Sequence, residues 1–198
     1  MLNMRKGMVS PMVVAMMSGL MSIALAADTY KLDKSHTRVG FKVSHLVISN
    51  VRGDFTDYDA TIEFDENDVT QSSVQGTIET ASINTNNERR DKHLRSDDFF
   101  NAEQHPQITF KSKRIEKKGK GYVMIGDLTI RGVTREIQLP FKLTGPIDHG
   151  KKRRVGFEAE MVINRQDYGV KYNNLADTGG LAVGNEVTIE LNGEAIRQ

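Results

Sequence analysis

The feature that most constrains the fold is an alternation of apolar and polar residues with a period of two, which returns along most of the chain. It is clearest over residues 155–163, where apolar side chains occupy every second position. Successive side chains of a β-strand point to opposite faces of a sheet, so the pattern predicts strands with one buried face. Eight strands are predicted, at residues 37–45, 58–65, 74–80, 108–116, 122–130, 137–143, 155–163 and 187–191.

The connections between these segments are mostly short and rich in turn residues, as in Lys117-Lys118-Gly119-Lys120-Gly121. Short connections join antiparallel neighbours, because a parallel crossover needs a dozen or more residues. Eight antiparallel strands with one apolar face must hide that face and their edges, and a closed barrel does both. We therefore expect an all-β fold, an eight-stranded antiparallel barrel. Two packed sheets also satisfy the pattern.

One segment interrupts the strands. Thr85 and Glu88 have the spacing of a capping box, which satisfies free backbone donors at a helix start. The sequence predicts one short, highly charged helix around residues 86–95 that caps a barrel mouth or covers the sheet, with Leu94, Phe99 and Phe100 facing inward. Residues 165–184 are rich in Gly and Asn and predict a long loop.

The first residues predict export. Arg5 and Lys6 precede an apolar run, and Ala24-Leu25-Ala26 supplies the small-residue pattern that a signal peptidase recognises. We expect a cleaved signal peptide at residues 1–26, with the cut between Ala26 and Ala27, and a single domain at residues 27–198. An uncleaved membrane anchor is the alternative, since the apolar run reaches the lower length limit of a membrane span.

Composition excludes several functions. The chain has no cysteine, which rules out thiol catalysis, disulfides and cysteine-based zinc sites. Removing residues 1–26 removes two basic and no acidic residues, which leaves 25 basic and 26 acidic side chains. A nucleic-acid-binding protein usually shows a basic excess. We therefore expect no nucleic-acid partner.

The inward faces predict the character of the interior. Small residues at Ala60, Gly76, Gly126 and Ala159 indicate unfilled volume, and large apolar neighbours indicate an apolar guest. Plain packing of small against large residues is the alternative. The residues expected to line a ligand tunnel are Val39, Phe41, Val43, Tyr58, Ile62, Phe64, Ile78, Phe110, Met124, Leu128, Leu139, Phe157 and Met161.

Only a few polar residues are candidates for contact with a ligand. His45, Asn86, Arg89 and His93 are candidates for contact with a ligand head group, because the last three lie on the predicted helix at the barrel mouth. A solvated surface is the alternative for each of them. No pair of histidines has metal-ligand spacing on a helix, and no Gly-x-Ser-x-Gly motif is present. We expect no metal site and no catalytic residues.

Several stretches resemble the YceI-like family of periplasmic polyisoprenoid-binding proteins. They are residues 32–45 (LDKSHTRVGFKVSH), 51–55 (VRGDF), 88–100 (ERRDKHLRSDDFF), 105–110 (HPQITF) and 126–134 (GDLTIRGVT). The resemblance covers essentially all of residues 27–198. It implies an extended, lipocalin-like, eight-stranded barrel in the periplasm, with a hydrophobic tunnel for an isoprenoid quinone, a polyprenyl chain or a related amphiphile. It supplies no catalytic residue.

The leading hypothesis is therefore a periplasmic protein that holds a polyisoprenoid or isoprenoid-quinone-type amphiphile for transport, storage or sequestration. No cofactor is expected apart from such a bound lipid, and an inner-membrane protein is a further expected partner. Two alternatives stay open. One is a non-enzymatic, stress-related structural or interaction protein with a filled barrel, and the other is an enzyme acting on a bound lipid or quinone. The sequence carries no mark of the oligomeric state.

Overall fold

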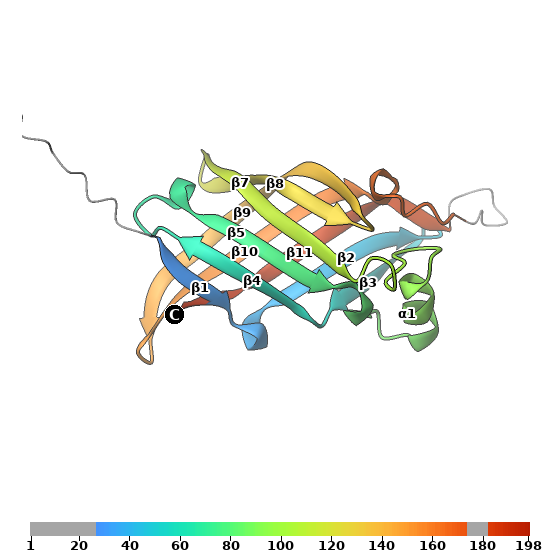
Figure 1. Ribbon diagram of the computed structural model, residues 1–198, viewed down its shortest axis with the longest axis horizontal. Helices are drawn as coiled ribbons and strands as arrows, with labels where there is room; N and C mark the ends of the chain where they lie inside the picture. Colours follow the sequence, from blue (N-terminus) through green and yellow to red (C-terminus); the bar gives the residue numbers. More distant parts are fainter. Residues whose placement is uncertain (1–26, 174–181) are drawn as a thin grey trace, which may run out of the picture.

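The computed structural model describes residues 27–173 and 182–198 (Figure 1). The predicted signal peptide at residues 1–26 lies outside the described residues, as does part of the predicted loop at residues 165–184. Within the described ranges, no helix has both the length and the apolar character needed to cross a membrane.

Strands make up most of the chain, and each begins and ends close to a turn residue or a short 3-10 segment. The strands are β1 (Asp28–Leu32), β2 (Arg38–His45), β3 (Ser49–Phe55), β4 (Tyr58–Phe64), β5 (Ser73–Glu79), β6 (Ile83–Asn84), β7 (Gln107–Lys118), β8 (Gly121–Ile130), β9 (Val133–His149), β10 (Lys152–Asn164) and β11 (Val183–Arg197). The helical segments are η1 (Lys34–His36), η2 (Val69–Gln71), η3 (Thr80–Ser82), α1 (Glu88–Arg95) and η4 (Arg165–Tyr168).

The strands form one antiparallel sheet that closes on itself. The order β1-β4-β5-β7-β8-β9-β10-β11 is completed by a pairing of β11 with β1, which gives an eight-stranded ring. The strand β11 is long enough to hold two partners along one edge: residues 195–197 pair with β1, and residues 183–192 pair with β2. β3 and β6 extend the sheet beyond β2.

The predicted fold class, an eight-stranded antiparallel barrel with one short helix, is confirmed. The structure adds β1, β3 and β6 to the strands that the alternation predicts. β1 is only five residues long, and β3 carries Gly53 at an inward position, so neither shows an extended apolar alternation. β1 is nonetheless the strand that closes the ring.

The helix begins where the sequence predicts, but its cap is different. Asn87, not Thr85, is the N-cap residue, and its side chain accepts a hydrogen bond from the backbone N–H of Arg90. Thr85 is buried instead, and its hydroxyl donates to the carboxylate of the buried Asp91. Because Arg90 Nε donates to the same hydroxyl oxygen at 2.7 Å, Thr85 ties the helix to the chain that precedes it.

The barrel is elongated, and its two ends differ (Figure 1). We call one end the helix end: it carries α1, η4 and the β2–β3 turn, and its core includes Phe55, Ile83 and Tyr168. We call the other the seam end, where β1 meets the last residues of β11 and where Tyr30, Phe64, Val155 and Ala195 pack together. A third cluster around Ile115, Met124 and Leu139 lies within the wall formed by β7, β8 and β9.

Candidate ligand-binding site

The barrel encloses an apolar cavity of about 330 Å³. Its wall is formed by the inward faces of β2, β4, β5 and β7–β11, and residues Leu94, Phe99 and Phe100 of the helical segment contribute to it as well. This volume lies in the range of roughly 300–1,000 Å³ that is usual for small-molecule sites. The predicted inward orientation of Leu94, Phe99 and Phe100 is thus observed.

All of the residues expected to line a tunnel are placed on the wall of this cavity. They are Val39, Phe41, Val43, Tyr58, Ile62, Phe64, Ile78, Phe110, Met124, Leu128, Leu139, Phe157 and Met161. The alternation succeeds because each strand contributes side chains to the interior at every second residue. In β7 a bulge between Ser112 and Arg114 shifts the register, so that Ile115, at an odd position, faces inward after Phe110. That the lining residues contact a ligand stays a prediction.

The small inward residues do not all leave space. Ala60, Gly76 and Ala159 lie on the cavity wall. At Gly126, however, a Cβ atom would lie 2.6 Å from the ring of Phe110, so the aromatic ring already fills the volume above this glycine. Phe41 covers Gly53 in the same way. The expectation of unfilled volume at Gly126 is therefore wrong, because an aromatic neighbour takes that volume.

None of the predicted head-group residues lies on the cavity wall. His45 ends β2 beyond Val43, the last residue of that strand to line the cavity. Asn86 and Arg89 are exposed on the solvent side of the helical segment. His93 is held against α1, with its Nε2 atom 2.8 Å from Asp98 Oδ2 and its ring edge-on to Phe99. The polar groups of Asn86 and Arg89 thus face solvent at the helix end.

One charged residue that was not among the predicted head-group residues does lie on the cavity wall. Arg165 opens η4 directly after β10, is only 5% exposed and lies on the cavity wall. Its guanidinium donates to backbone carbonyls, including that of Val170 at 2.7 Å. Burial lowers the pKa of this guanidinium. A usable sequence signal existed, because residue 165 continues the inward alternation of residues 155–163.

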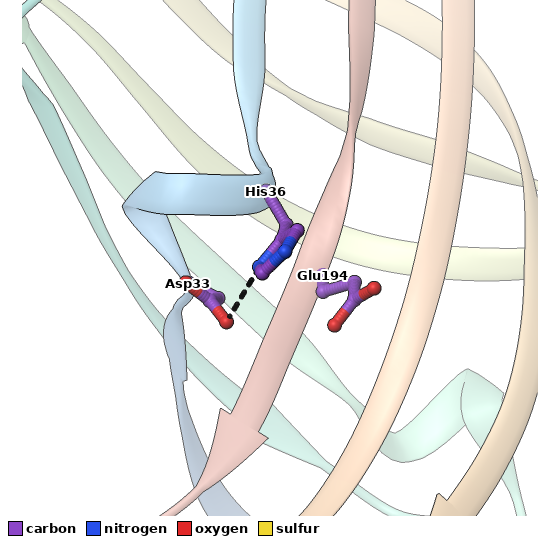
Figure 2. A group of neighbouring side chains, drawn as sticks. All are labelled: Asp33, His36 and Glu194. Carbon is purple, nitrogen blue, oxygen red and sulfur yellow. Dashed lines mark hydrogen bonds and ion pairs between the residues drawn. The ribbon is translucent and has the colours of Figure 1, made fainter.

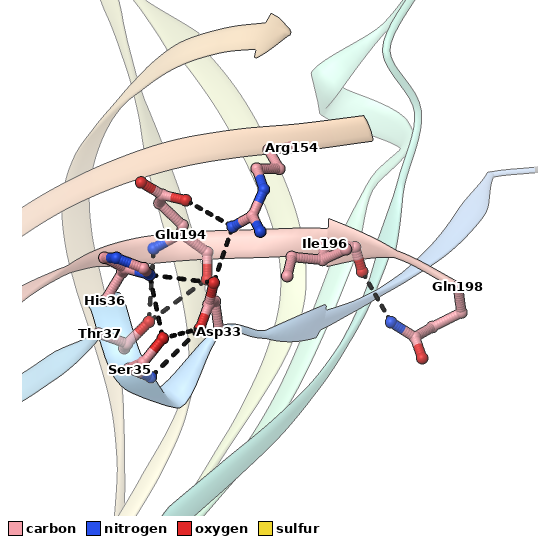
Figure 3. A network of polar contacts seen from close by, with 8 residues as sticks. All are labelled: Asp33, Ser35, His36, Thr37, Arg154, Glu194, Ile196 and Gln198. Atoms are coloured by element: carbon pink, nitrogen blue, oxygen red, sulfur yellow. Dashed lines mark hydrogen bonds and ion pairs between the residues drawn. The ribbon is translucent and has the colours of Figure 1, made fainter. Parts of the chain in front are cut away.

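A polar cluster outside the barrel joins Asp33, His36 and Glu194 (Figure 2). His36 Nδ1 lies 3.1 Å from Asp33 Oδ2. Arg154 Nη1 donates to Asp33 Oδ2 at 2.7 Å and to Glu194 Oε2 at 2.9 Å (Figure 3). Hydrogen bonds from Ser35 and then from Arg154 hold the pKa of Asp33 well below its usual range. Since a guanidinium already bridges the two carboxylates, the cluster is a charge network that fastens β11 to the chain after β1.

The cavity offers little reactive chemistry. Among the described residues on its wall, the ionisable ones are Tyr58, Asp59, Arg165 and Tyr168. Tyr58 donates its hydroxyl hydrogen to the carbonyl of Thr37, and burial raises the pKa of this phenol. The Asp59 side chain is exposed and bonds to the neighbouring backbone N–H of Ala60. The wall therefore offers mainly apolar surface, which is suited to an apolar molecule.

The fold and the site together define an antiparallel β-barrel protein with an apolar cavity in its interior. Residues 30–195 match the YceI-like domain, and the chain belongs to this family. It is 45% identical to Protein YceI of Escherichia coli over 152 residues, which cover 75% of this chain and 78% of that protein.

Solved structures agree with this placement. The chain is similar to the YceI protein of Campylobacter jejuni, with a TM-score of 0.69 and 38% identity over 85% of this chain and 98% of that one. It also shares its fold with a polyisoprenoid binding domain from Saccharophagus degradans, with a TM-score of 0.62 and 16% identity over 85% of this chain and 98% of that one. The family resemblance predicted from the sequence is thus confirmed.

Proposed function

We propose that this protein is exported to the periplasm and there holds a long-chain polyisoprenoid or isoprenoid-quinone-type amphiphile, for transport, storage or sequestration. The observation that carries the proposal is the cavity itself, which is enclosed by the barrel and lined almost entirely by apolar side chains. The polyisoprenoid binding domain that shares this fold supports the choice of ligand class.

The energetics of burial support such a ligand. Removing apolar surface from water contributes roughly 25 cal/mol per Å². A C40 isoprenoid chain would therefore contribute more than roughly ten kcal/mol before the cost of association, which is several kcal/mol. Contacts of this kind need no exact polar match, so we expect several long amphiphiles to compete for the cavity. We expect binding without turnover.

The cavity also bears on the alternative of a filled barrel. That alternative predicts side chains packed through the centre, whereas the interior of this barrel holds a cavity of about 330 Å³. The proposed function therefore accounts for a feature that a purely structural barrel does not require. An enzyme acting on a bound lipid would need reactive groups on the wall. His45, the titratable head-group candidate on a strand, is not on that wall.

The test is to fill the cavity and measure uptake. Protein purified from the periplasm is extracted with organic solvent, the extract is identified by mass spectrometry, and the emptied protein is reloaded with a quinone or polyprenol. Ala159→Phe places a ring inside the barrel, and Glu160→Phe places the same ring on the exposed face of β10.

We expect Ala159→Phe to lose most of the uptake and Glu160→Phe to keep it, with both variants folded by circular dichroism. Equal uptake by the two variants would mean that the ligand does not occupy the cavity. Repeated recovery of empty wild-type protein, together with no uptake of either probe, would overturn the proposed function itself.

A further inference from the structure

The guanidinium of Arg165 is a buried positive charge whose hydrogen-bond partners among the described residues are all neutral. Nε donates to Gly184 O at 2.9 Å, and Nη1 donates to Val170 O at 2.7 Å. Nη2 donates to Val183 O at 3.2 Å and to the amide oxygen of Asn185 at 3.3 Å. Across residues 27–173 and 182–198, no carboxylate forms an ion pair with this side chain.

The hydrogen-bonding capacity of this side chain is not exhausted. A guanidinium carries five N–H donors, and the bonds to described residues use four of them. The fifth belongs to Nη1, the same atom that donates to Val170. Both Val170 and Val183, whose carbonyls hold the group, lie on the cavity wall together with Arg165. These bonds hold the charge beside the cavity, behind a wall whose exposed surface is almost entirely apolar.

Two other half-buried arginines are compensated by acids, whereas the half-buried Arg90 and Arg131 donate to neutral oxygens of Thr85 and Phe99. Arg153 lies 2.7 Å from Glu66 and 3.0 Å from Asp148, and Arg154 bridges two carboxylates. A buried cation without a counter-ion is costly, and an apolar surrounding screens its field poorly. Backbone carbonyls satisfy N–H groups but bring no net negative charge. The guanidinium of Arg165 at the helix end therefore has no carboxylate partner among the described residues.

We propose that the ligand of this cavity carries an anionic head group, a phosphate or a carboxylate, which pairs with Arg165 while its apolar tail runs along the barrel. The proposal rests on the proposed function and specifies the class of amphiphile. A planar guanidinium is matched to carboxylate and phosphate oxygens, and such charge-assisted bonds are stronger than neutral ones. The tail would extend from Arg165 past Ile163 and Met161, which precede it on the inward face of β10.

Matched ligand pairs test this assignment. Geranylgeranyl phosphate is compared with geranylgeraniol, and palmitate with hexadecanol, so that each pair differs only in its head group. Binding is measured by displacement of a neutral fluorescent probe, N-phenyl-1-naphthylamine, from emptied protein at pH 7.5. We expect the wild type to bind at least one anionic ligand about tenfold more tightly than its alcohol. The two pairs distinguish a phosphate from a carboxylate head.

Single-residue variants show which side chain causes the preference for the anionic ligand. Arg165→Gln should bind each alcohol within about twofold of the wild type and lose the preference for the anion, and Arg165→Lys should keep part of it. Arg153→Gln, which removes a guanidinium at the seam end, is the matched control and should keep it fully. Asp177→Asn removes the acidic side chain of residues 174–181 and should leave the preference unchanged.

The outcomes separate the two proposals. A wild type that binds the anion and the alcohol equally well overturns the assignment of Arg165, while the proposed function stands; this result needs no variant. A preference that survives in Arg165→Gln, or one that rises in Asp177→Asn, also overturns it. If no long-chain ligand of either kind displaces the probe, the proposed function fails first.

Discussion

The two ends of the barrel treat buried charge in opposite ways. At the seam end, Glu66 accepts hydrogen bonds from Tyr30 at 2.6 Å and from Arg153 at 2.7 Å, so each charge has its partner. At the helix end, the hydrogen-bond partners of Arg165 within residues 27–173 and 182–198 are carbonyl and amide oxygens. The comparison shows that one end is built for closure of the ring. The other end keeps an unmatched charge beside the cavity.

The pKa values of Glu66 and Tyr30 at the seam end reflect the contacts between these side chains and Arg153. The hydrogen bonds from Arg153 lower the pKa of Glu66 to about 2. Burial, followed by the hydrogen bond to Glu66, raises the pKa of Tyr30 well above its usual range. A carboxylate with a depressed pKa stabilises the fold above its ordinary pKa, and this contribution is lost as the pH falls towards the depressed value. We therefore expect acid to weaken the seam end.

Removal of the aromatic ring at the seam should have the largest effect. Tyr30 is fully buried and packs edge-on against Phe64, with ring centroids 5.4 Å apart. Tyr30→Ala should lower the free energy of unfolding by about 3–5 kcal/mol, because it leaves a cavity between β1 and β4. Urea unfolding at pH 7 measures this loss. Tyr30→Phe, which keeps the ring, should lose only about 1 kcal/mol, and an equal loss in both variants would mean that packing is not the cause.

A phenylalanine at the helix end should matter less. Phe41 packs near Phe55, with ring centroids 6.0 Å apart, but it also lines the cavity. Since part of the ring already borders empty space, Phe41→Ala should lose about 2 kcal/mol, below the usual range for a buried aromatic residue. The same urea experiment measures this. A loss as large as that of Tyr30→Ala would remove the proposed difference in packing between the two ends.

The smallest effect concerns the dependence of stability on pH. Between pH 7 and pH 3 the wild type should lose part of the contribution of ionised Glu66, because the pKa of this carboxyl is lowered to about 2. In Glu66→Gln the fall in unfolding free energy over this interval should be smaller by about 1–2 kcal/mol. Urea unfolding at the two pH values measures the difference. Glu186→Gln, at an exposed position near the start of β11, is the control, and identical pH profiles for Glu66→Gln and the wild type would contradict the assigned pairing.

Much of the barrel is predictable from the sequence, because a strand with one buried face imposes its period on the residues. Phe157 and Met161 show this plainly, since they face inward as the alternation requires. β3 is less visible, because its inward position at Gly53 is completed by the ring of Phe41 from the neighbouring strand. Such a pair depends on the register between strands, which one segment alone does not reveal.

The charged residue on the cavity wall is harder to predict from the sequence. Charged residues are frequent on the helix around Arg89, and their number favours a head-group site there, but Arg89 faces solvent. Arg165 is a single arginine in a segment that reads as a loop, yet it continues the inward alternation of β10. Composition therefore indicated an element whose charged residues lie off the cavity wall, whereas the period of the strand indicates a position on that wall. An ionisable residue that continues an apolar face merits inspection even beyond the predicted end of a strand.

The pairing of β1 with the end of β11 has a consequence for how the molecule is made. Tyr30 lies opposite Arg197, so the ring joins the first described strand to the last. Contacts between residues so distant in sequence form slowly, because the entropy of the intervening chain must be lost first. The interior therefore stays open to water until the final strand has been synthesised. A nascent chain that lacks β11 would expose the apolar inner face of its strands to chaperones and membranes.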